Sequence, residues 1–184
     1  SFDADEHTTL DKWTDMISDV MHDSVKAHKI SDVEVGSFLS SGVDSAVITA
    51  LASKLSPGIK AFTVSFGVKD YSEMEDASEI AKHLDIDHIK RVATFEDFIN
   101  VYDKVMYHLD SPVADPSVMA IYLICEEAAR HVKVVLSGEG SDELFGGYPW
   151  YHNKDILFED CFPWSRSQEI RRFILKDGVL KNGE

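Results

Sequence analysis

Apolar residues along the chain follow two patterns, helical spacing over long stretches and short runs between them. The spacing of Leu10, Trp13 and Ile17 predicts an amphipathic helix over residues 9–28. The same spacing predicts later helices over residues 44–55, 73–84, 95–105 and 118–131. The short runs predict strands over residues 33–39, 59–66, 88–93 and 133–137. Helices and strands are therefore expected to alternate along the chain.

This alternation is typical of an α/β fold, and it predicts a doubly wound parallel sheet with flanking helices. A chain of 184 residues is long enough to form one domain with a sizeable core. Residues 110–117 contain two prolines and are expected to form a loop. The pattern weakens after Gly147, where residues 168–176 are expected to form one more helix.

A turn of small residues follows the first strand, within a segment that we name the first motif (residues 39–45). The turn reads Ser40-Ser41-Gly42-Val43-Asp44-Ser45. Such a turn directs backbone N–H groups at one point near the positive end of a helix dipole, so it can hold a phosphate. Asp44 is expected either to cap the helix or to hold a metal ion that bridges to the phosphate. The turn lacks the lysine of a Walker A loop, and a plain strand-to-helix turn stays an alternative.

The second motif (residues 136–148) reads LSGEGSDELFGGY and follows the last predicted strand. Its acids Glu139, Asp142 and Glu143 repel one another unless solvent or a cation compensates. In a parallel sheet both motifs lie at the carboxyl edge, where ligands bind. A magnesium ion held by Asp44 and Asp142, together with phosphate oxygens, would account for both motifs. A solvated acidic turn is the alternative for the second motif.

The composition is that of a globular protein, with 44% hydrophobic and 28% charged residues. A net charge of -15 argues against nucleic acid as a partner, because nucleic-acid binding needs basic patches. No apolar stretch is long enough to span a membrane and no signal peptide is visible, so we expect no membrane partner and a cytoplasmic protein. Cys125 and Cys161 lack metal-ligand spacing and are expected to be free thiols, although a disulfide between them stays open.

The two motifs together resemble a known family. LSSGVDS in the first motif is similar to the pyrophosphate loop of the ATP pyrophosphatase (PP-loop) superfamily, usually written SGGxDS, with Ser41 where the first glycine is commoner. The second motif resembles the synthetase domain of glutamine-dependent asparagine synthetases, and His88 and the segment 111–117 fit the same family. The resemblance covers about residues 10–150 and implies an adenine nucleotide alpha-hydrolase-like fold of the HUP type.

Asparagine synthetases use ATP to adenylate the side-chain carboxylate of aspartate, and ammonia then displaces AMP from β-aspartyl-AMP to give asparagine. The resemblance therefore implies ATP and Mg2+ as cofactors, and ATP, aspartate and ammonia as substrates. The implied pyrophosphate loop consists of Ser40, Ser41, Gly42, Val43, Asp44 and Ser45. The residues implied to line the nucleotide site are Leu39, Val64, Ser137 and Gly138. Asp44 and Asp142 are the implied metal ligands. Glu139 and Asp142 are the implied catalytic residues, with Glu139 handling the ammonia proton or the intermediate.

Two alternatives stay open beside asparagine synthesis. A related PP-loop synthetase of the β-lactam synthetase kind would adenylate a different carboxylate, and most residues of its acceptor pocket are expected beyond Glu184. A nucleotide-binding fragment without turnover is the other, because the family's glutaminase domain and its downstream reactive lysine are both missing from this chain. We therefore expect a single synthetase domain over residues 1–184, truncated at the C-terminus and little active alone. Apolar surface near Phe145, Trp150 and Tyr151 would favour a homo-oligomer.

Several other residues are expected to have ordinary structural roles. The eight histidines show no metal-binding pattern, and His83 and His88 are expected at the surface or in packing. Asp115 and Ser117 fit equally well as the cap of the next helix and as part of a loop near the acceptor pocket. An aromatic stripe on one helix is expected in the core, and it consists of Phe95, Phe98 and Tyr102.

Overall fold

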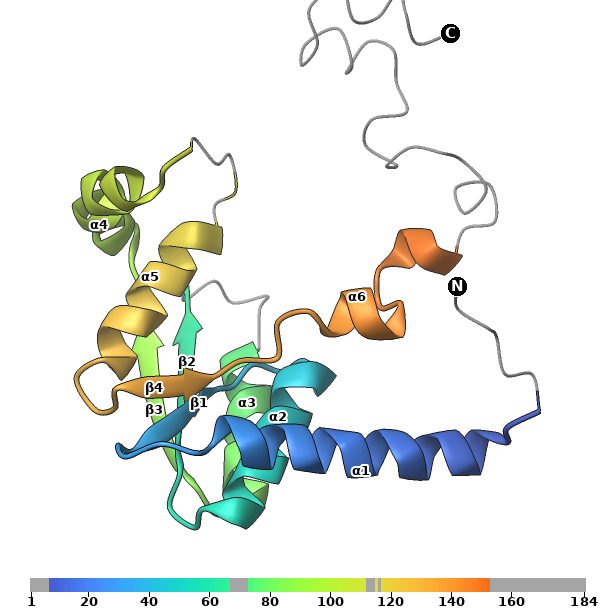
Figure 1. The fold of residues 1–184 in the computed structure, drawn as a ribbon. Helices are drawn as coiled ribbons and strands as arrows, with labels where there is room; N and C mark the ends of the chain where they lie inside the picture. Colours follow the sequence, from blue (N-terminus) through green and yellow to red (C-terminus); the bar gives the residue numbers. More distant parts are fainter. Residues whose placement is uncertain (1–6, 67–72, 112–114, 116, 153–184) are drawn as a thin grey trace, which may run out of the picture. The chain divides into compact units, whose positions relative to one another are not determined.

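The computed structural model of the chain describes residues 7–66, 73–111, 115 and 117–152. The chain divides into two compact units, residues 1–138 and residues 139–184. The first unit contains the whole sheet, and the second unit begins within the second motif (Figure 1). Within the described ranges, none of the helices is both long and apolar enough to cross a membrane.

The sheet of the first unit has four strands in the order β3-β2-β1-β4, and all neighbouring pairs are parallel. The strands are β1 (Val35–Phe38), β2 (Lys60–Ser65), β3 (Asp87–Val92) and β4 (Val134–Leu136). The predicted parallel sheet is therefore confirmed, although β1, β2 and β4 are shorter than predicted and β3 lies one residue earlier than predicted. β1 does not include Val33, because the Val33 amide donates a hydrogen bond to the Ser31 hydroxyl (3.2 Å) in the preceding turn.

Five helices of the first unit follow the predicted alternation with the strands (Figure 1). They are α1 (Leu10–His28), α2 (Val43–Leu55), α3 (Glu73–His83), α4 (Phe95–His108) and α5 (Ser117–Ala128). The last of these ends three residues before its predicted end, because the chain after Ala128 forms tight turns. In these turns the amides of Arg130 and His131 donate to carbonyls three residues back.

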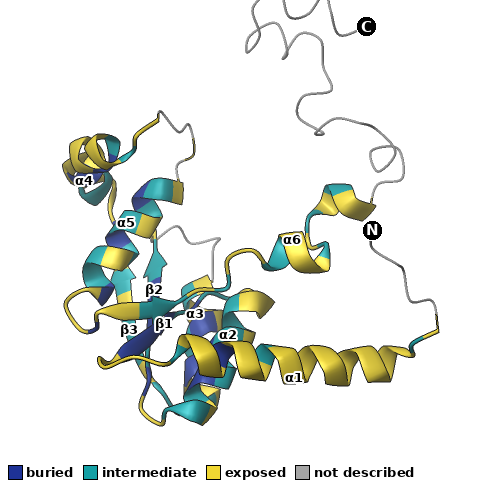
Figure 2. Cartoon of the chain, viewed as in Figure 1, coloured by how far each residue is buried: buried dark blue, intermediate teal, exposed yellow. Residues whose placement is uncertain are grey.

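Helices cover both faces of the sheet, as neighbouring residues of β2 demonstrate. Ala61 packs in a buried cluster with Ala77 and Ala81 of α3. Phe62 points to the opposite face and packs with Ala128 of α5. In Figure 2 the buried residues concentrate in the strands and in the helix faces against them. The prediction of a doubly wound sheet is confirmed.

The centre of the sheet accommodates Phe62 because its neighbour on β1 is a glycine. A Cβ on Gly36 would lie 2.6 Å from the Phe62 ring and 3.1 Å from a backbone oxygen of Lys60, so a larger residue does not fit. The next residue, Ser37, is fully buried and forms a hydrogen bond of 2.8 Å with the buried Thr49 hydroxyl of α2. This pair satisfies two polar groups in the core and fixes α2 against β1.

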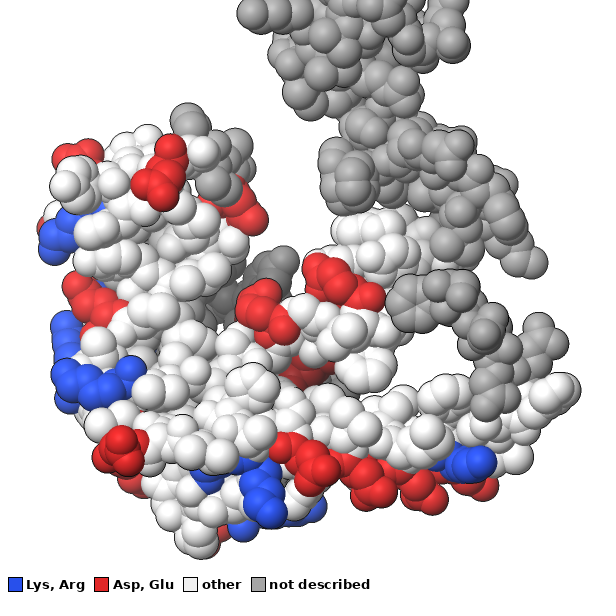
Figure 3. All heavy atoms as spheres, in the orientation of Figure 1, with Lys and Arg blue, Asp and Glu red and all other residues white. Residues whose placement is uncertain are grey.

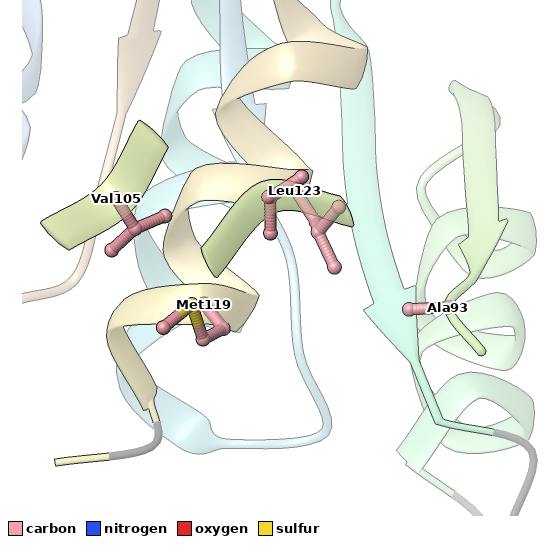
Figure 4. Packing of buried hydrophobic residues seen from close by; sticks show 5 residues of the cluster. Ala93, Val105, Met119 and Leu123 are labelled. Atoms are coloured by element: carbon pink, nitrogen blue, oxygen red, sulfur yellow. The ribbon is translucent and has the colours of Figure 1, made fainter. Parts of the chain in front are cut away.

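A separate cluster joins α4 and α5 at one end of the sheet, and Figure 4 shows its buried members Ala93, Val105, Met119 and Leu123. Phe98 packs against this cluster, as predicted. The prediction that Phe95 and Tyr102 lie in the core is wrong, because their exposed fractions are 81% and 52%. The buried side of α4 is centred on Val101 and Val105. Successive residues of an α-helix are rotated by about 100° about its axis, so Phe95 and Tyr102 lie at the edge of this buried side.

α1 forms as predicted, but much of its apolar side is exposed among the described residues. Val25 is its buried residue and packs with Ala52 of α2 and Ile59. Leu10 and Trp13, by contrast, are exposed. Acidic side chains run along the same helix (Figure 3), and those at four-residue intervals are Asp11, Asp15, Asp19 and Asp23.

The described part of the second unit contains two short helices that the sequence did not predict. They are α6 (Ser141–Phe145) and the 3-10 helix η1 (Pro149–His152). Gly140 and Gly146 flank α6 with φ values of +89° and +68°, so each adopts a left-handed conformation that suits glycine. The helix predicted over residues 168–176 lies outside the described residues.

Candidate functional site

The first motif and the start of the second lie at the point where the strand order reverses. β1 has β2 on one side and β4 on the other, and the chain reaches β4 only after completing β2 and β3. In sheets of this type, ligands bind outside the carboxyl ends of the strands at such a switch point. The first motif follows β1, and Ser137 and Gly138 follow β4. The fold therefore places both segments where the sequence predicted a ligand.

Two serine hydroxyls close the first motif into a compact turn. The Ser40 amide donates to Ser45 Oγ (3.0 Å), and the two hydroxyl oxygens lie 2.9 Å apart. The Ser45 hydroxyl also lies 3.1 Å from the Gly42 carbonyl oxygen, and the Gly42 amide donates to Ser40 Oγ (3.2 Å). The conformation of the turn is thus held by its own side chains.

The turn leads directly into the N-terminus of α2. Gly42 is the N-cap residue, and the first helical hydrogen bond runs from the Ala46 amide to the Gly42 carbonyl (3.1 Å). Among the residues that the structure describes, the amides of residues 43–45 have no hydrogen-bond acceptor. These amides and the helix dipole make this helix end suitable for an anion.

The segment after β4 packs closely on this helix end. A Cβ on Gly138 would lie 2.9 Å from the Ser45 nitrogen, 3.0 Å from the Asp44 carbonyl carbon and 3.1 Å from Asp44 Cβ. Only a glycine allows this approach without movement of the backbone. The contact brings the first motif together with the start of the second, as the sequence predicted.

The Asp44 carboxylate fits the metal-ligand prediction better than the capping prediction. Asp44 is exposed in the first turn of α2, while Gly42 occupies the capping position without a side-chain cap. Across the described ranges, no three or more His, Cys, Asp or Glu side chains gather as a metal site. A magnesium ion needs only one or two carboxylates when phosphate oxygens and water complete its shell. The Asp44 side chain therefore suits a Mg2+ ion that arrives with a phosphate.

The other two residues implied to line the nucleotide site lie at the carboxyl ends of the inner strands. Leu39 is buried with Ala61 of β2. Val64 is half-buried and packs against the cluster between α4 and α5. Their side chains contribute to the core, so any contact of these residues with a nucleotide would involve their backbone or the remaining exposed surface. Their role as lining residues stays a prediction.

The predicted residues Glu139 and Asp142 belong to the second unit. Within that unit the Asp142 carboxylate lies against Gly147, where a Cβ would come 2.0 Å from Asp142 Oδ1. Gly147 is therefore required for the observed position of this carboxylate. Whether Glu139 and Asp142 meet Asp44 stays a prediction.

Glu143 lies beside Asp142 on α6, and its carboxylate accepts a hydrogen bond from an aromatic hydroxyl. The Tyr148 hydroxyl donates to Glu143 Oε1 (2.7 Å), and its ring stacks on Trp150 with centroids 4.4 Å apart. The hydrogen bond to Glu143 raises the pKa of Tyr148 to about 12 and holds the pKa of Glu143 below its usual value. Glu143 thus stays ionised at neutral pH and connects α6 to the aromatic residues that follow it.

The residues outside the two motifs give mixed outcomes. The Ser117 amide donates to Asp115 Oδ1 (2.9 Å) ahead of α5, which lowers the pKa of Asp115 and confirms the interpretation of Asp115 as a cap. Its role near an acceptor pocket stays a prediction. Cys125 is exposed, and Cys161 lies outside the described residues. His88 is half-buried and hydrogen-bonded to Thr63, a connection that no motif in the sequence indicates.

The chain is similar to known proteins over most of its length. A family model described as Asparagine synthase matches residues 16–184. The chain is 44% identical over 144 residues to glutamine-hydrolyzing asparagine synthetase 1 of Bacillus subtilis (strain 168), covering 78% of this chain and 23% of that protein. It is 32% identical over 168 residues to glutamine-hydrolyzing asparagine synthetase B of Escherichia coli (strain K12), covering 82% of this chain and 30% of that protein.

Solved structures give a weaker likeness. The NH3-dependent NAD synthetase from Campylobacter jejuni matches with a TM-score of 0.48 and 20% identity, over 77% of this chain and 61% of that chain. The chain spans less than a third of the length of the two curated relatives.

Proposed function

The chain belongs to the asparagine synthase family, and we propose that it binds ATP and activates the side-chain carboxylate of aspartate for asparagine synthesis. The observation that carries this proposal is the contact of Gly138 with the Asp44–Ser45 peptide. It joins two separate motifs at the switch point of the sheet. A plain turn after β1 would not need a second loop packed on its amides.

In the proposed reaction, a carboxylate oxygen of aspartate attacks the α-phosphorus of ATP and pyrophosphate leaves. β-Aspartyl-AMP forms, and ammonia then attacks its acyl carbon and releases AMP. Negative charge grows on the leaving pyrophosphate, so donors fixed in advance at that position lower the barrier. The amides of residues 43–45 and the Ser40 and Ser41 hydroxyls are the donors that we assign to the β and γ phosphates.

Asp44 and Asp142 would hold Mg2+ in this proposal. The ion supplies positive charge that offsets the phosphate oxygens. Ser137, Gly138, Leu39 and Val64 would line the nucleotide. Glu139 would handle the proton of ammonia or contact the intermediate, provided that its position and pKa suit this task.

The identity of the acceptor carboxylate, the ammonia source and the location of the protein are further proposals. The names of both relatives include glutamine hydrolysis, and we propose ammonia as the nitrogen donor of the reaction. We also propose a cytoplasmic protein, able to form a homo-oligomer through the apolar residues of the second unit. A β-lactam synthetase-like enzyme and a nucleotide-binding fragment without turnover are the alternatives.

The experiment measures pyrophosphate release from ATP with magnesium, aspartate and ammonium. It compares aspartate with other carboxylates as the acceptor. We expect aspartate-dependent release, with asparagine as the product.

Each other outcome of this experiment decides against one part of the proposal. Release that depends on another carboxylate would favour the β-lactam synthetase-like alternative. ATP binding without release would favour the alternative of nucleotide binding without turnover.

A further inference from the structure

We propose that His88 positions the first peptide group of the first motif, acting through Thr63 as a neutral imidazole with its proton on Nε2. This inference rests on the proposed function for its effect on ATP, and on geometry alone for the hydrogen-bond chain. His88 lies on β3, Thr63 on β2, and the peptide group of Leu39 and Ser40 directly follows β1. The three strands thus bring one hydrogen-bond chain to the proposed phosphate site.

The register of the sheet places these side chains together. His88 pairs with Ala61 across β2 and β3, and Thr63 is two residues further along β2. Residues two apart on a strand share a face, so Thr63 and His88 are diagonal neighbours. Thr63 Oγ1 lies 2.7 Å from His88 Nε2 and 2.6 Å from the Leu39 carbonyl oxygen. Thr63 is buried, so both contacts are shielded from water.

The direction of each hydrogen bond follows from the chemistry of the groups. A carbonyl oxygen can only accept, so the Thr63 hydroxyl donates its single proton to Leu39. The Thr63 oxygen then accepts from His88 Nε2, which must carry a proton. The contact with Thr63 therefore selects one of the two neutral tautomers of His88.

The hydrogen-bond chain continues through the Leu39–Ser40 peptide group into the first motif. The carbonyl that Thr63 holds and the Ser40 amide belong to the same peptide, and the Ser40 amide donates to Ser45 Oγ (3.0 Å). Both ends of this peptide are thus fixed, and hydrogen bonds in series strengthen one another. Rotation of the peptide would break both bonds and displace the two serine hydroxyls of the turn.

The second ring nitrogen of His88 favours the neutral form. Nδ1 is buried and has no hydrogen-bond partner among the residues that the structure describes. Protonation would place a second N–H there without an acceptor. Burial, together with the positive charge of Lys90, lowers the pKa of His88. A neutral imidazole gives the Thr63 contact the same form across the neutral pH range.

The first test compares three variants by calorimetric titration with ATP and magnesium. His88→Leu fills similar space without a donor, His88→Gln offers an amide donor at a similar reach, and Thr63→Val removes the connecting hydroxyl. We expect about tenfold weaker ATP binding for His88→Leu and for Thr63→Val, because each substitution breaks the hydrogen-bond chain that holds the Leu39–Ser40 peptide group. His88→Gln should bind within about twofold of the wild type, and the double variant should lose no more than either single one.

Equal weakening by His88→Gln and His88→Leu would overturn the proposal in favour of a packing role. Wild-type affinity in His88→Leu would also overturn it, as would additive losses in the double variant. Thermal unfolding of each variant, measured in parallel, shows which of them remain folded at the titration temperature.

The second test does not depend on ATP or on folding of a variant. Nitrogen NMR of the wild-type chain, labelled at histidine, distinguishes a protonated from an unprotonated ring nitrogen. We expect His88 to show a proton on Nε2 and none on Nδ1 at neutral pH. A proton on Nδ1, or averaging between tautomers, would overturn the hydrogen-bond chain. If the wild type fails to bind ATP while this signature is present, the proposed function fails. The hydrogen-bond chain from His88 to Ser45 is then still supported.

Discussion

Gly138 lies against the peptide group that joins Asp44 to Ser45, so closely that a Cβ would come 2.9 Å from the Ser45 nitrogen. Helix–strand crossovers do not require such a contact. It makes the loop after β4 part of the surface around the N-terminus of α2. An anion bound at that helix end would therefore touch residues from both motifs.

The first prediction concerns this contact. Gly138→Ala should force the two segments apart, because the atoms that meet the new methyl group are backbone atoms. We expect destabilisation of about 1–3 kcal/mol and weaker ATP binding. Urea unfolding and calorimetric titration with ATP and magnesium measure the two effects.

Gly58→Ala is the control for this variant. Its φ of +83° makes alanine strained there, and nothing lies within 4 Å of the new Cβ. This control should lose stability without losing ATP affinity. Unchanged stability and affinity in Gly138→Ala would contradict the observed packing of the two motifs.

The second prediction concerns the metal. Asp44→Asn and Asp142→Asn should each weaken magnesium-dependent ATP binding by at least about tenfold, because even the outer partners of metal ligands contribute that much. Neither variant should unfold, since Asp44 is exposed and Asp142 is half-buried. Asp19→Asn, an exposed acid on α1, is the matched control for the loss of one negative charge. If both variants bind Mg2+ and ATP as well as the control does, Asp44 and Asp142 are not the metal ligands.

The third prediction concerns the hydroxyl that closes the turn. Ser45→Ala removes the acceptor of the Ser40 amide and the contact with Ser40 Oγ. We expect a loss of about 1 kcal/mol in the free energy of unfolding and weaker ATP binding. Ser53→Ala, which removes one hydroxyl contact to the Ala50 carbonyl within α2, is the control. Equal effects of the two substitutions on ATP affinity would show that the Ser45 hydroxyl has no special role.

The fourth prediction concerns acid stability at the start of α4. The Thr94 hydroxyl and amide donate to the Asp97 carboxylate at 2.6 and 2.7 Å, and these bonds, with Arg91 nearby, hold the pKa of Asp97 below its usual value of 3.8. The unfolded chain therefore takes up the proton first as the pH falls. The stability that Asp97 contributes is full above its usual pKa and is lost as the pH falls through its lowered value.

Urea unfolding of the wild type and Asp97→Asn over a pH series checks this prediction. The difference in unfolding free energy should be largest near neutral pH and shrink below about pH 4. Asp103→Asn, an exposed substitution on the same helix, should give no such trend. A difference that stays constant down to acid pH would contradict the contribution of the Asp97 carboxylate.

Periodicity predicted α1 to α5 well because these helices are long enough to show the repeat, and the short apolar runs between them indicated the strands. α6 was missed for the opposite reason, since its five residues show less than two helical turns. The error at Phe95 and Tyr102 has another cause. Spacing identifies an apolar stripe, but the packing of α5 decides which edge of that stripe is covered.

The parts of the site that depend on the order of elements along the sequence could be predicted. Small residues between a strand and a helix indicated the first motif, and the arrangement of parallel strands placed both motifs at one edge. The connection from His88 through Thr63 was not predictable, because it depends on the register between β2 and β3. A histidine and a threonine on separate strands carry no sign of that register in the sequence.

The most direct test of the central claim is an amide NMR titration of the chain with ATP and magnesium. If the N-terminus of α2 and the loop after β4 form the phosphate site, the amide signals of residues 40–45 and of Ser137 and Gly138 should shift together at one apparent affinity. Magnesium should be needed for the full effect, and the amides of α1 should not move. Shifts confined to other segments, or no shifts at millimolar ATP with magnesium, would contradict the account.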